Sequence, residues 1–408
     1  MIAGTPVLDL DDAASLEAAD SGGALRSAAS GGAQVRATAA AVGEDALARL
    51  VDLRPRSLVL VTGPGRATRA AGVLVAAVGE RAGLPIVPAP ALPPWVGPLD
   101  VVVVAGDDAG DPRLIEAVDR GQRRGAEVVI AAPLEGPLRT AAGRRAALLE
   151  PRVPVLDHNR LLRYLAAGIA VLHAIDPARS GAAAPDLTAL ADVLDAEALR
   201  DAPQNEVFHN PAKTLAARMQ QRGIVFSGDS PATAELAEHG AEVLLHAAGR
   251  VATAVDLHEA VAAHAVMLDA AGGSAPDFDP MFHDEELDGP APVERMRVFV
   301  LSTDADQAAA RRRIATFGGS GLVDADLVNA DVDLLQSALR DPSAPTPTPA
   351  RAADETGVPL PVSATHSTEL EQLAVLALRI EMAAAYLRLI GWRGGAPAAD
   401  ERYDGGRY

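Results

Sequence analysis

Short apolar runs alternate with longer alanine-, leucine- and arginine-rich segments through the first half of the chain. Runs of this kind are typical of buried strands and the longer segments are typical of helices, which together form βαβ units around a parallel sheet. We therefore predict a five-stranded α/β layer. Its strands are expected at 57–62, 84–87, 99–105, 126–131 and 153–156, and its helices at 66–82, 111–124, 135–149 and 158–173.

A second alternation begins near residue 206. Helices are expected at 211–221, 231–248, 257–268 and 305–315, and strands at 223–227 and 296–302. An alanine-rich stretch at 11–42 predicts two short helices outside the first sheet, and helically spaced apolar residues predict a last helix at 368–390. We divide the chain into an N-terminal helical segment (1–45), a first α/β domain (46–180), a linker (181–205), a second α/β domain (206–340), a Pro-rich loop (341–362) and a C-terminal helix with its tail (363–408).

The charge balance limits the partners that the protein can bind. The chain has 36 basic and 55 acidic side chains, a formal net charge of −19, and its single lysine is Lys213. Nucleic acids and anionic membranes need clustered positive charge, so we expect neither as a partner. The chain has no cysteine, the start is acidic where a signal peptide is basic, and no stretch approaches the roughly 18 apolar residues of a membrane span. These features predict a cytoplasmic protein.

The turn from Gly63 to Thr68 stands between a predicted strand and a predicted helix. Its glycines, Gly63 and Gly65, allow a tight turn that brings backbone amides and the positive end of the helix dipole toward an anion. A dinucleotide site is disfavoured, because the third glycine is missing and the strand that follows ends without an acid for a ribose. Two interpretations stay open: a single phosphate site contacted by Gly63, Gly65, Arg66 and Thr68, or a tight turn that binds nothing.

A second loop, from Gly106 to Pro112, should lie beside that turn, because ligands and loops gather outside the carboxyl ends of parallel strands. Gly110 is a candidate phosphate contact there. Asp107, Asp108 and Asp111 oppose phosphate by about 5 kcal/mol each at 6 Å and an effective dielectric of 20, unless they point away or an arginine intervenes. The alternative is a solvated capping loop with Asp111 as the helix N-cap.

Glu242 and His258 are candidate groups for proton transfer. A glutamate can abstract a carbon-bound proton and a histidine can shuttle protons near neutral pH, although most glutamates on such a helix are solvated charges. No nucleophile elbow or Walker loop occurs, which disfavours serine-hydrolase and P-loop chemistry. The nine histidines do not show the spacing of a metalloprotease, so no metal site is predicted.

Several short segments resemble one known family. The segments 92–96 (Leu-Pro-Pro-Trp-Val), 124–126 (Arg-Gly-Ala) and 210–213 (Asn-Pro-Ala-Lys), together with the two-domain order, resemble the SIS (sugar isomerase) proteins over about residues 30–392. The resemblance is to the bifunctional phosphoglucose/phosphomannose isomerases, in their divergent actinobacterial TobH-like branch. It implies two SIS-type parallel-sheet sandwich domains with a C-terminal helical extension, and a homodimer.

The resemblance also implies roles for particular residues. Glu242 falls on the family's catalytic base, His258 on its ring-opening histidine, and Arg160 on an arginine that stabilises the enediol. The Gly63–Gly65 turn falls on the family's glycine turn. The loop at Gly106–Asp111 falls on a hydroxyl-rich phosphate loop, but here it carries acids, and the family's terminal lysine is missing.

The implied function is aldose–ketose isomerisation of glucose 6-phosphate or mannose 6-phosphate to fructose 6-phosphate through a cis-enediol, without a cofactor. The rival hypothesis is a non-catalytic SIS module that binds a carbohydrate derivative or a protein partner in a regulatory role, which the acidic loop favours. A nucleotide-binding oxidoreductase is disfavoured for want of a ribose-binding acid.

Overall fold

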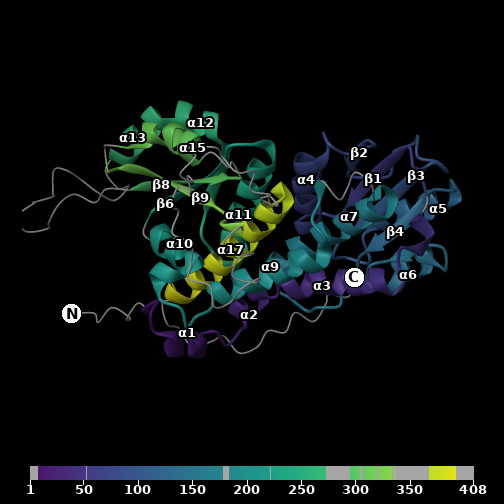
Figure 1. Ribbon diagram of the computed structural model, residues 1–408, viewed down its shortest axis with the longest axis horizontal. Helices are drawn as coiled ribbons and strands as arrows, with labels where there is room; N and C mark the ends of the chain where they lie inside the picture. Colours follow the sequence, from purple (N-terminus) through teal and green to yellow (C-terminus); the bar gives the residue numbers. More distant parts are fainter. Residues whose placement is uncertain are drawn as a thin grey trace, which may run out of the picture.

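The computed structural model of the protein describes residues 8–272 except 52, 178–182 and 221, and then 295–303, 307–318, 321–332, 335 and 367–391. Two parallel sheets lie side by side along the long axis, each with helices against it (Figure 1). This is the α/β fold class expected from the alternating pattern. The predicted Pro-rich loop and the C-terminal tail lie outside the described residues.

The first sheet has five parallel strands in the order β2-β1-β3-β4-β5. Its central strands β1 and β3 are rich in valine and buried along nearly their whole length, as expected for a sheet covered on both faces. The order reverses between β1 and β3, so the loops after these strands adjoin at a topological switch point. The strands are β1 (Ser57–Thr62), β2 (Ile86–Ala89), β3 (Asp100–Ala105), β4 (Glu127–Ala131) and β5 (Ala147–Leu148).

The fifth strand is not where the sequence pattern placed it. The predicted strand at 153–156 is wrong, since these residues form no strand, and β5 lies inside the predicted helix 135–149. That helix, α6, spans only Gly136–Ala142, because Gly143 turns away with φ 55°. Pro154 interrupts the apolar run at 153–156, and proline has no amide hydrogen for a sheet.

The second sheet also has only parallel neighbours, in the order β7-β6-β8-β9. Its inner strands were predicted, but both edge strands were missed because their partly exposed positions alternate with polar residues and form no continuous apolar run. The strands are β6 (Gly223–Gly228), β7 (Ala252–Asp256), β8 (Met296–Ser302) and β9 (Val323–Asn329).

Helices cover both sheets. The N-terminal segment forms three helices, not two, and the predicted helix 257–268 is broken at Ala263. The predicted linker contains a packed helix, α9. The remaining helices are α1 (Ala13–Ala19), α2 (Ala24–Ala29), α3 (Gly31–Gly43), α4 (Arg66–Val78), α5 (Pro112–Arg123), α7 (Leu161–Ile175), α9 (Leu187–Arg200), α10 (Pro211–Met219), α11 (Pro231–Ala248), α12 (Leu257–Ala262), α13 (His264–Gly272), α15 (Gln307–Ile314) and α17 (Glu369–Gly391).

The C-terminal helix α17 lies in the middle of the molecule and packs against α11, α10, α9 and α2 (yellow in Figure 1). It is buried on almost every side, and three of its charged residues, Glu371, Arg379 and Glu381, are among the buried ones. One continuous apolar core contains residues of both sheets together with this helix. The helix therefore connects the two halves of the fold.

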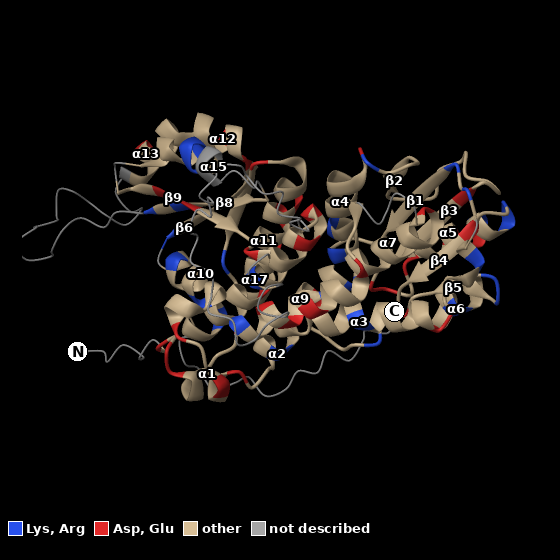
Figure 2. Ribbon diagram, in the orientation of Figure 1, with Lys and Arg blue, Asp and Glu red and all other residues tan. Residues whose placement is uncertain are grey.

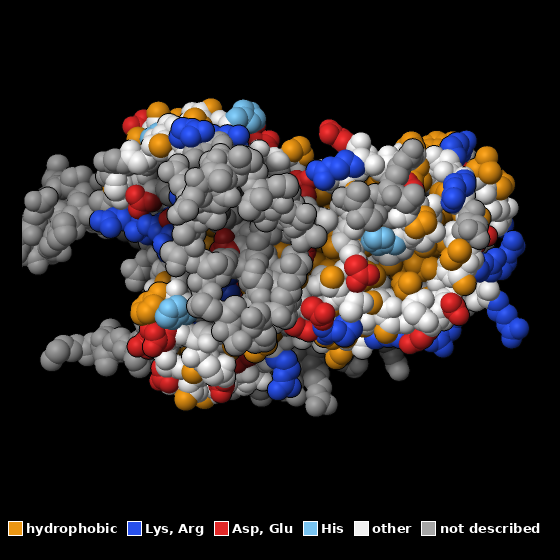
Figure 3. Space-filling model, viewed as in Figure 1, with side chains coloured by type: hydrophobic (Ala, Val, Ile, Leu, Met, Phe, Trp, Pro, Cys, Tyr) orange, Lys and Arg blue, Asp and Glu red, His pale blue; other side chains and the backbone are white. Residues whose placement is uncertain are grey.

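Among the described residues visible in Figure 3, basic side chains lie scattered among acidic ones. None of the helices that the structure describes combines the length and the apolar character needed to cross a bilayer.

Candidate active site at the junction of α4 and α11

The turn from Gly63 to Thr68 connects β1 to α4 and touches the loop after β3. The amide of Gly63 donates to the carbonyl oxygen of Ala105 over 2.8 Å, which confirms that the two loops are neighbours. Thr68 Oγ1 donates to the carbonyl oxygen of Gly63 over 2.8 Å, so Thr62 Oγ1, 3.0 Å away, donates to Thr68. Both threonine hydroxyl protons are thus used within the turn.

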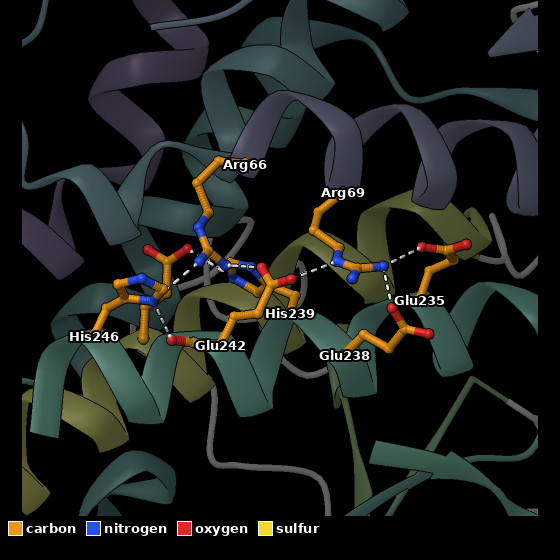
Figure 4. A network of polar contacts seen from close by, with 8 residues as sticks. Arg66, Arg69, Glu235, Glu238, His239, Glu242 and His246 are labelled. Carbon is orange, nitrogen blue, oxygen red and sulfur yellow. Dashed lines mark hydrogen bonds and ion pairs between the residues drawn. The ribbon is translucent and has the colours of Figure 1, made fainter. Parts of the chain in front are cut away.

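Arg66, the first residue of α4, points into the protein. Its side chain is only 6% exposed, and Nη1 lies 2.7 Å from Oε2 of Glu242 on α11 (Figure 4). The same nitrogen lies 3.2 Å from Nδ1 of His239. Burial lowers the pKa of Arg66, while the charges of Glu242 and Glu381 oppose that shift.

Arg69, one turn further along α4, meets three carboxylates of α11. Its Nε donates to Glu242 Oε1 over 2.9 Å, Nη1 donates to Glu235 Oε2 over 3.3 Å, and Nη1 also pairs with Glu238 (Figure 4). In Figure 2 basic positions of α4 lie opposite acidic positions of α11. Burial acts to lower the pKa of Arg69, but the hydrogen bond with Glu242 and the three carboxylates outweigh it and raise that pKa. Gly72 permits this approach, because a Cβ there would lie 2.4 Å from Glu235 Oε2.

Glu242 is therefore held at both carboxylate oxygens, one by Arg66 and one by Arg69. Its side chain is 31% exposed, so solvent reaches the pair from one side. Each oxygen of this carboxylate still has a second lone pair that could take a proton from a substrate carbon. The arrangement fits a base that is held ready, and it fits equally a structural clamp between α4 and α11.

Behind Arg66 a buried chain of hydrogen bonds reaches α17. Arginine can only donate, so Nδ1 of His239 accepts from Arg66 and its Nε2–H donates to Glu381 Oε1 over 3.1 Å. Asn159 Nδ2 donates to the other oxygen of Glu381 over 3.0 Å, and Ser27 Oγ donates to Asn159 Oδ1 over 2.7 Å. Burial raises the pKa of Glu381 to about 8 and holds the pKa of His239 well below its usual value.

The loop after β3 has an arginine at its first aspartate. Asp107 Oδ1 lies 3.0 Å from Nη1 of Arg160, accepts from the hydroxyl of Tyr164 over 2.5 Å, and also accepts from Arg163. Asp107 therefore has its charge balanced within the chain. Burial raises the pKa of the Tyr164 hydroxyl, which keeps it a donor.

The other two aspartates have local roles. Asp108 accepts from the amide of Gly110 over 2.7 Å, so that amide is already used. Asp111 is the N-cap of α5, as predicted, and accepts from the amide of Arg113 over 2.9 Å. A hydrogen bond from the Arg113 side chain lowers the pKa of Asp111.

The structure brings some of the predicted site residues together and leaves one apart. The turn at Gly63–Thr68 reaches Glu242 through Arg66, and Arg160 joins the adjoining loop through Asp107. His258 lies exposed in the first turn of α12, and no contact between it and Glu242 or Arg160 is found in the part of the chain that the structure describes. The described residues also contain no group of three side chains placed to hold a metal ion.

Sequence reasoning missed several residues of this site. The spacing of Glu235, Glu238 and Glu242 places three acids on one face of α11, and Arg66 and Arg69 share a face of α4, so helical spacing alone could have paired these two faces. His239 and Glu381 were not detectable that way, because they come from different elements and show no local pattern.

Comparison with known proteins places this fold. No protein-family model matches the sequence, and no curated protein matches it. Solved structures do match over nearly the whole chain. A candidate phosphosugar isomerase from Silicibacter pomeroyi is 15% identical, with 90% of this chain and 97% of that chain covered and a TM-score of 0.52.

Two further structures agree. A candidate phosphosugar isomerase from Clostridium difficile is 10% identical, with coverage of 93% and 96% and a TM-score of 0.56. A tagatose-6-phosphate ketose/aldose isomerase from Escherichia coli is 11% identical, with 95% of both chains covered and a TM-score of 0.50. The chain has the SIS fold of the phosphosugar isomerases. At sequence identities this low, the similarity to these structures shows the fold alone, and the reaction has to be argued from the site.

Proposed function

We propose that the protein is a sugar-phosphate isomerase-like protein that converts glucose 6-phosphate or mannose 6-phosphate to fructose 6-phosphate through a cis-enediol. The observation that carries this proposal is the ion pair of Arg66 with Glu242. It joins the Gly63–Thr68 turn, at the carboxyl edge of the first sheet, to the carboxylate of Glu242 in the other half of the fold. A phosphorylated sugar bound at that edge would lie beside a potential base.

In this scheme the phosphate lies at the carboxyl edge of the first sheet, where the turn at Gly63–Thr68 meets the loop that contains Gly110. Glu242 takes the proton from C2 of the open-chain aldose and returns it to C1, while the hydroxyl proton on O2 passes to O1. Arg160 stabilises the negative charge that develops on the enediol oxygens. The scheme requires no cofactor.

His258 fits the scheme only in a dimer. Its side chain is exposed on α12 and has no contact with Glu242 or Arg160 among the described residues. A second copy of the chain could supply the histidine that opens the sugar ring. We therefore propose a homodimer, which measurement of the mass in solution would test. A cytoplasmic location and the absence of nucleic-acid partners stay predictions.

Formation of fructose 6-phosphate from glucose 6-phosphate, measured in a coupled assay, tests the proposal. Wild-type protein should convert the sugar, and the Glu242→Gln variant should lose activity about 100-fold or more, since general-base catalysis contributes that much. Glu238→Gln is the matched control, because Glu238 also pairs with Arg69 from α11 and is half exposed. Equal activity in the two variants would contradict the role of Glu242.

A second candidate function is a non-catalytic SIS module that binds a carbohydrate derivative or a protein partner. The specific support is that Glu242 and Asp107 are each held by two arginines of the same chain. A regulatory module has no need of a free base. Tight binding of a hexose 6-phosphate without any turnover would favour this function over the isomerase.

A further inference from the structure

Asp107 is held by an unusual set of donors. Arg160, Arg163 and Tyr164 all direct their polar atoms to the same carboxylate oxygen, Oδ1. Tyr164 also accepts a hydrogen bond from Arg163 over 3.0 Å, so the three side chains form one connected group. We call Arg160, Arg163 and Tyr164 the α7 donor group.

The α7 donor group has more positive charge and more hydrogen-bond donors than the single carboxylate of Asp107 can use. Asp107 brings one negative charge to two guanidinium groups, and the second acid near Arg160 is Asp157, which is 85% exposed and therefore weakly coupled. The Nε atoms of Arg160 and Arg163 are both buried and have no hydrogen-bond partner. Three donors on one oxygen and two idle donors beside them suit an anion with more oxygen atoms than a carboxylate.

The backbone adds to the positive potential at this place. Arg160 is the N-cap of α7, Arg163 and Tyr164 lie in its first turns, and no side chain caps this helix. The N-terminus of a helix of 15 residues carries a partial positive charge that favours anions. Asp107 itself is 28% exposed, so a ligand can approach the group from solvent.

Gln34, which lines a cavity together with two members of the α7 donor group, also has a polar atom without a hydrogen-bond partner. Arg163 and Tyr164 line a small cavity of about 20 Å³, room for about one water molecule, together with Gln34 and Thr38. Gln34 is only 2% exposed, its Nε2 donates to the carbonyl oxygen of Asn159, and its Oε1 has no partner. Gln34 Oε1, an acceptor without a donor, and Arg163 Nε, a donor without an acceptor, thus belong to two residues that line the same cavity.

We propose that Asp107 is an internal substitute for a tetrahedral oxyanion, the phosphate group of a ligand, which displaces Asp107 from Arg160, Arg163 and Tyr164 when it binds. The inference rests on the proposed function only for the sugar to which the phosphate belongs. It places the phosphate on Arg160, Arg163 and Tyr164 and not at the Gly63–Thr68 turn, so it replaces two parts of the scheme proposed above: the phosphate site and the contact of Arg160 with the enediol. Asp107 then acts as a built-in competitor that keeps the site closed to weakly bound anions.

Removal of the competing charge tests this inference. In Asp107→Asn the dissociation constant for inorganic phosphate, measured by calorimetry at constant ionic strength, should fall about tenfold or more, because charge-assisted hydrogen bonds are released to the ligand. Asp108→Asn is the matched control, since it removes the same charge from the next position, whose described side-chain hydrogen bond is the one from the Gly110 amide. Equal phosphate affinity in the two variants would overturn the inference.

Two further arms keep the test decisive. Tyr164→Phe removes one donor, so it should weaken phosphate binding both alone and combined with Asp107→Asn. If Asp107→Asn fails to fold, Tyr164→Phe alone still decides, because an unchanged phosphate affinity in that variant would overturn the inference. Glucose 6-phosphate and glucose are then titrated into Asp107→Asn. If phosphate and glucose 6-phosphate bind equally and glucose does not bind, the inference stands and the proposed sugar substrate fails.

Discussion

The buried cation Arg379 on α17 provides a sharp test of the packing between the halves of the fold. Its side chain is 6% exposed, Nε donates to Oε1 of Glu197 on α9 over 2.6 Å, and Nη1 donates to the carbonyl oxygen of Asn329 at the end of β9 over 2.7 Å. Glu197 is fully buried. Arg379→Met keeps most of the side-chain volume but leaves the Glu197 carboxylate buried without its close cation.

Loss of one partner of a buried ion pair costs about 3–5 kcal/mol, and this is the decrease in unfolding free energy expected for Arg379→Met. Urea unfolding followed by circular dichroism measures it. Adding Glu197→Gln should recover about 2 kcal/mol or more of the loss, because the stranded charge is removed. The control is Arg36→Met, whose 46% exposed side chain pairs with Asp192 and Asp195 of the same helix α9 and should contribute at most about 1 kcal/mol. A loss below about 1 kcal/mol for Arg379→Met would refute the reasoning.

Two other predictions concern the fold. Burial raises the pKa of Glu381 from 4.5 to about 8, so the native state binds a proton more tightly than the unfolded state does. This contribution to stability is lost as the pH rises from 4.5 to about 8. Glu381→Gln should therefore flatten the pH dependence of the unfolding free energy in this range, and an unchanged pH profile would contradict the prediction. A Cβ at Gly228 would lie 2.2 Å from the backbone nitrogen of Ala234. Thermal unfolding should therefore show that Gly228→Ala destabilises the protein by about 1–3 kcal/mol or more. Gly43→Ala is the control and should not destabilise it, because a Cβ at Gly43 meets open space.

The sequence pattern predicts the central strands well because burial leaves a clear trace there. The valine-rich runs of β1 and β3 are buried on both faces, and the same holds for the apolar part of β8. Edge strands have one neighbour and partial exposure, so β7 and β9 lack that trace. The two-residue strand β5 is too short to give any periodic signal.

The site could be predicted only in part for a related reason. Glu242, Arg160 and the turn at Gly63 were named from local motifs and a family resemblance. The partners of those residues come from elsewhere in the chain: Arg69 meets Glu242 across 173 positions, and Arg163 meets Asp107 across 56. Such pairs depend on the packing of α4 against α11 and of α7 against the loop after β3, which no single segment encodes.

Proton transfer at the sugar carbon tests the central claim most directly. Glucose 6-phosphate is incubated with the protein in D₂O, and the proton at C2 is followed by NMR. Wild-type protein should replace this proton with deuterium and form fructose 6-phosphate, and Glu242→Gln should do neither. Retention of the C2 proton with wild-type protein, under conditions where calorimetry shows the sugar phosphate bound, would contradict the account.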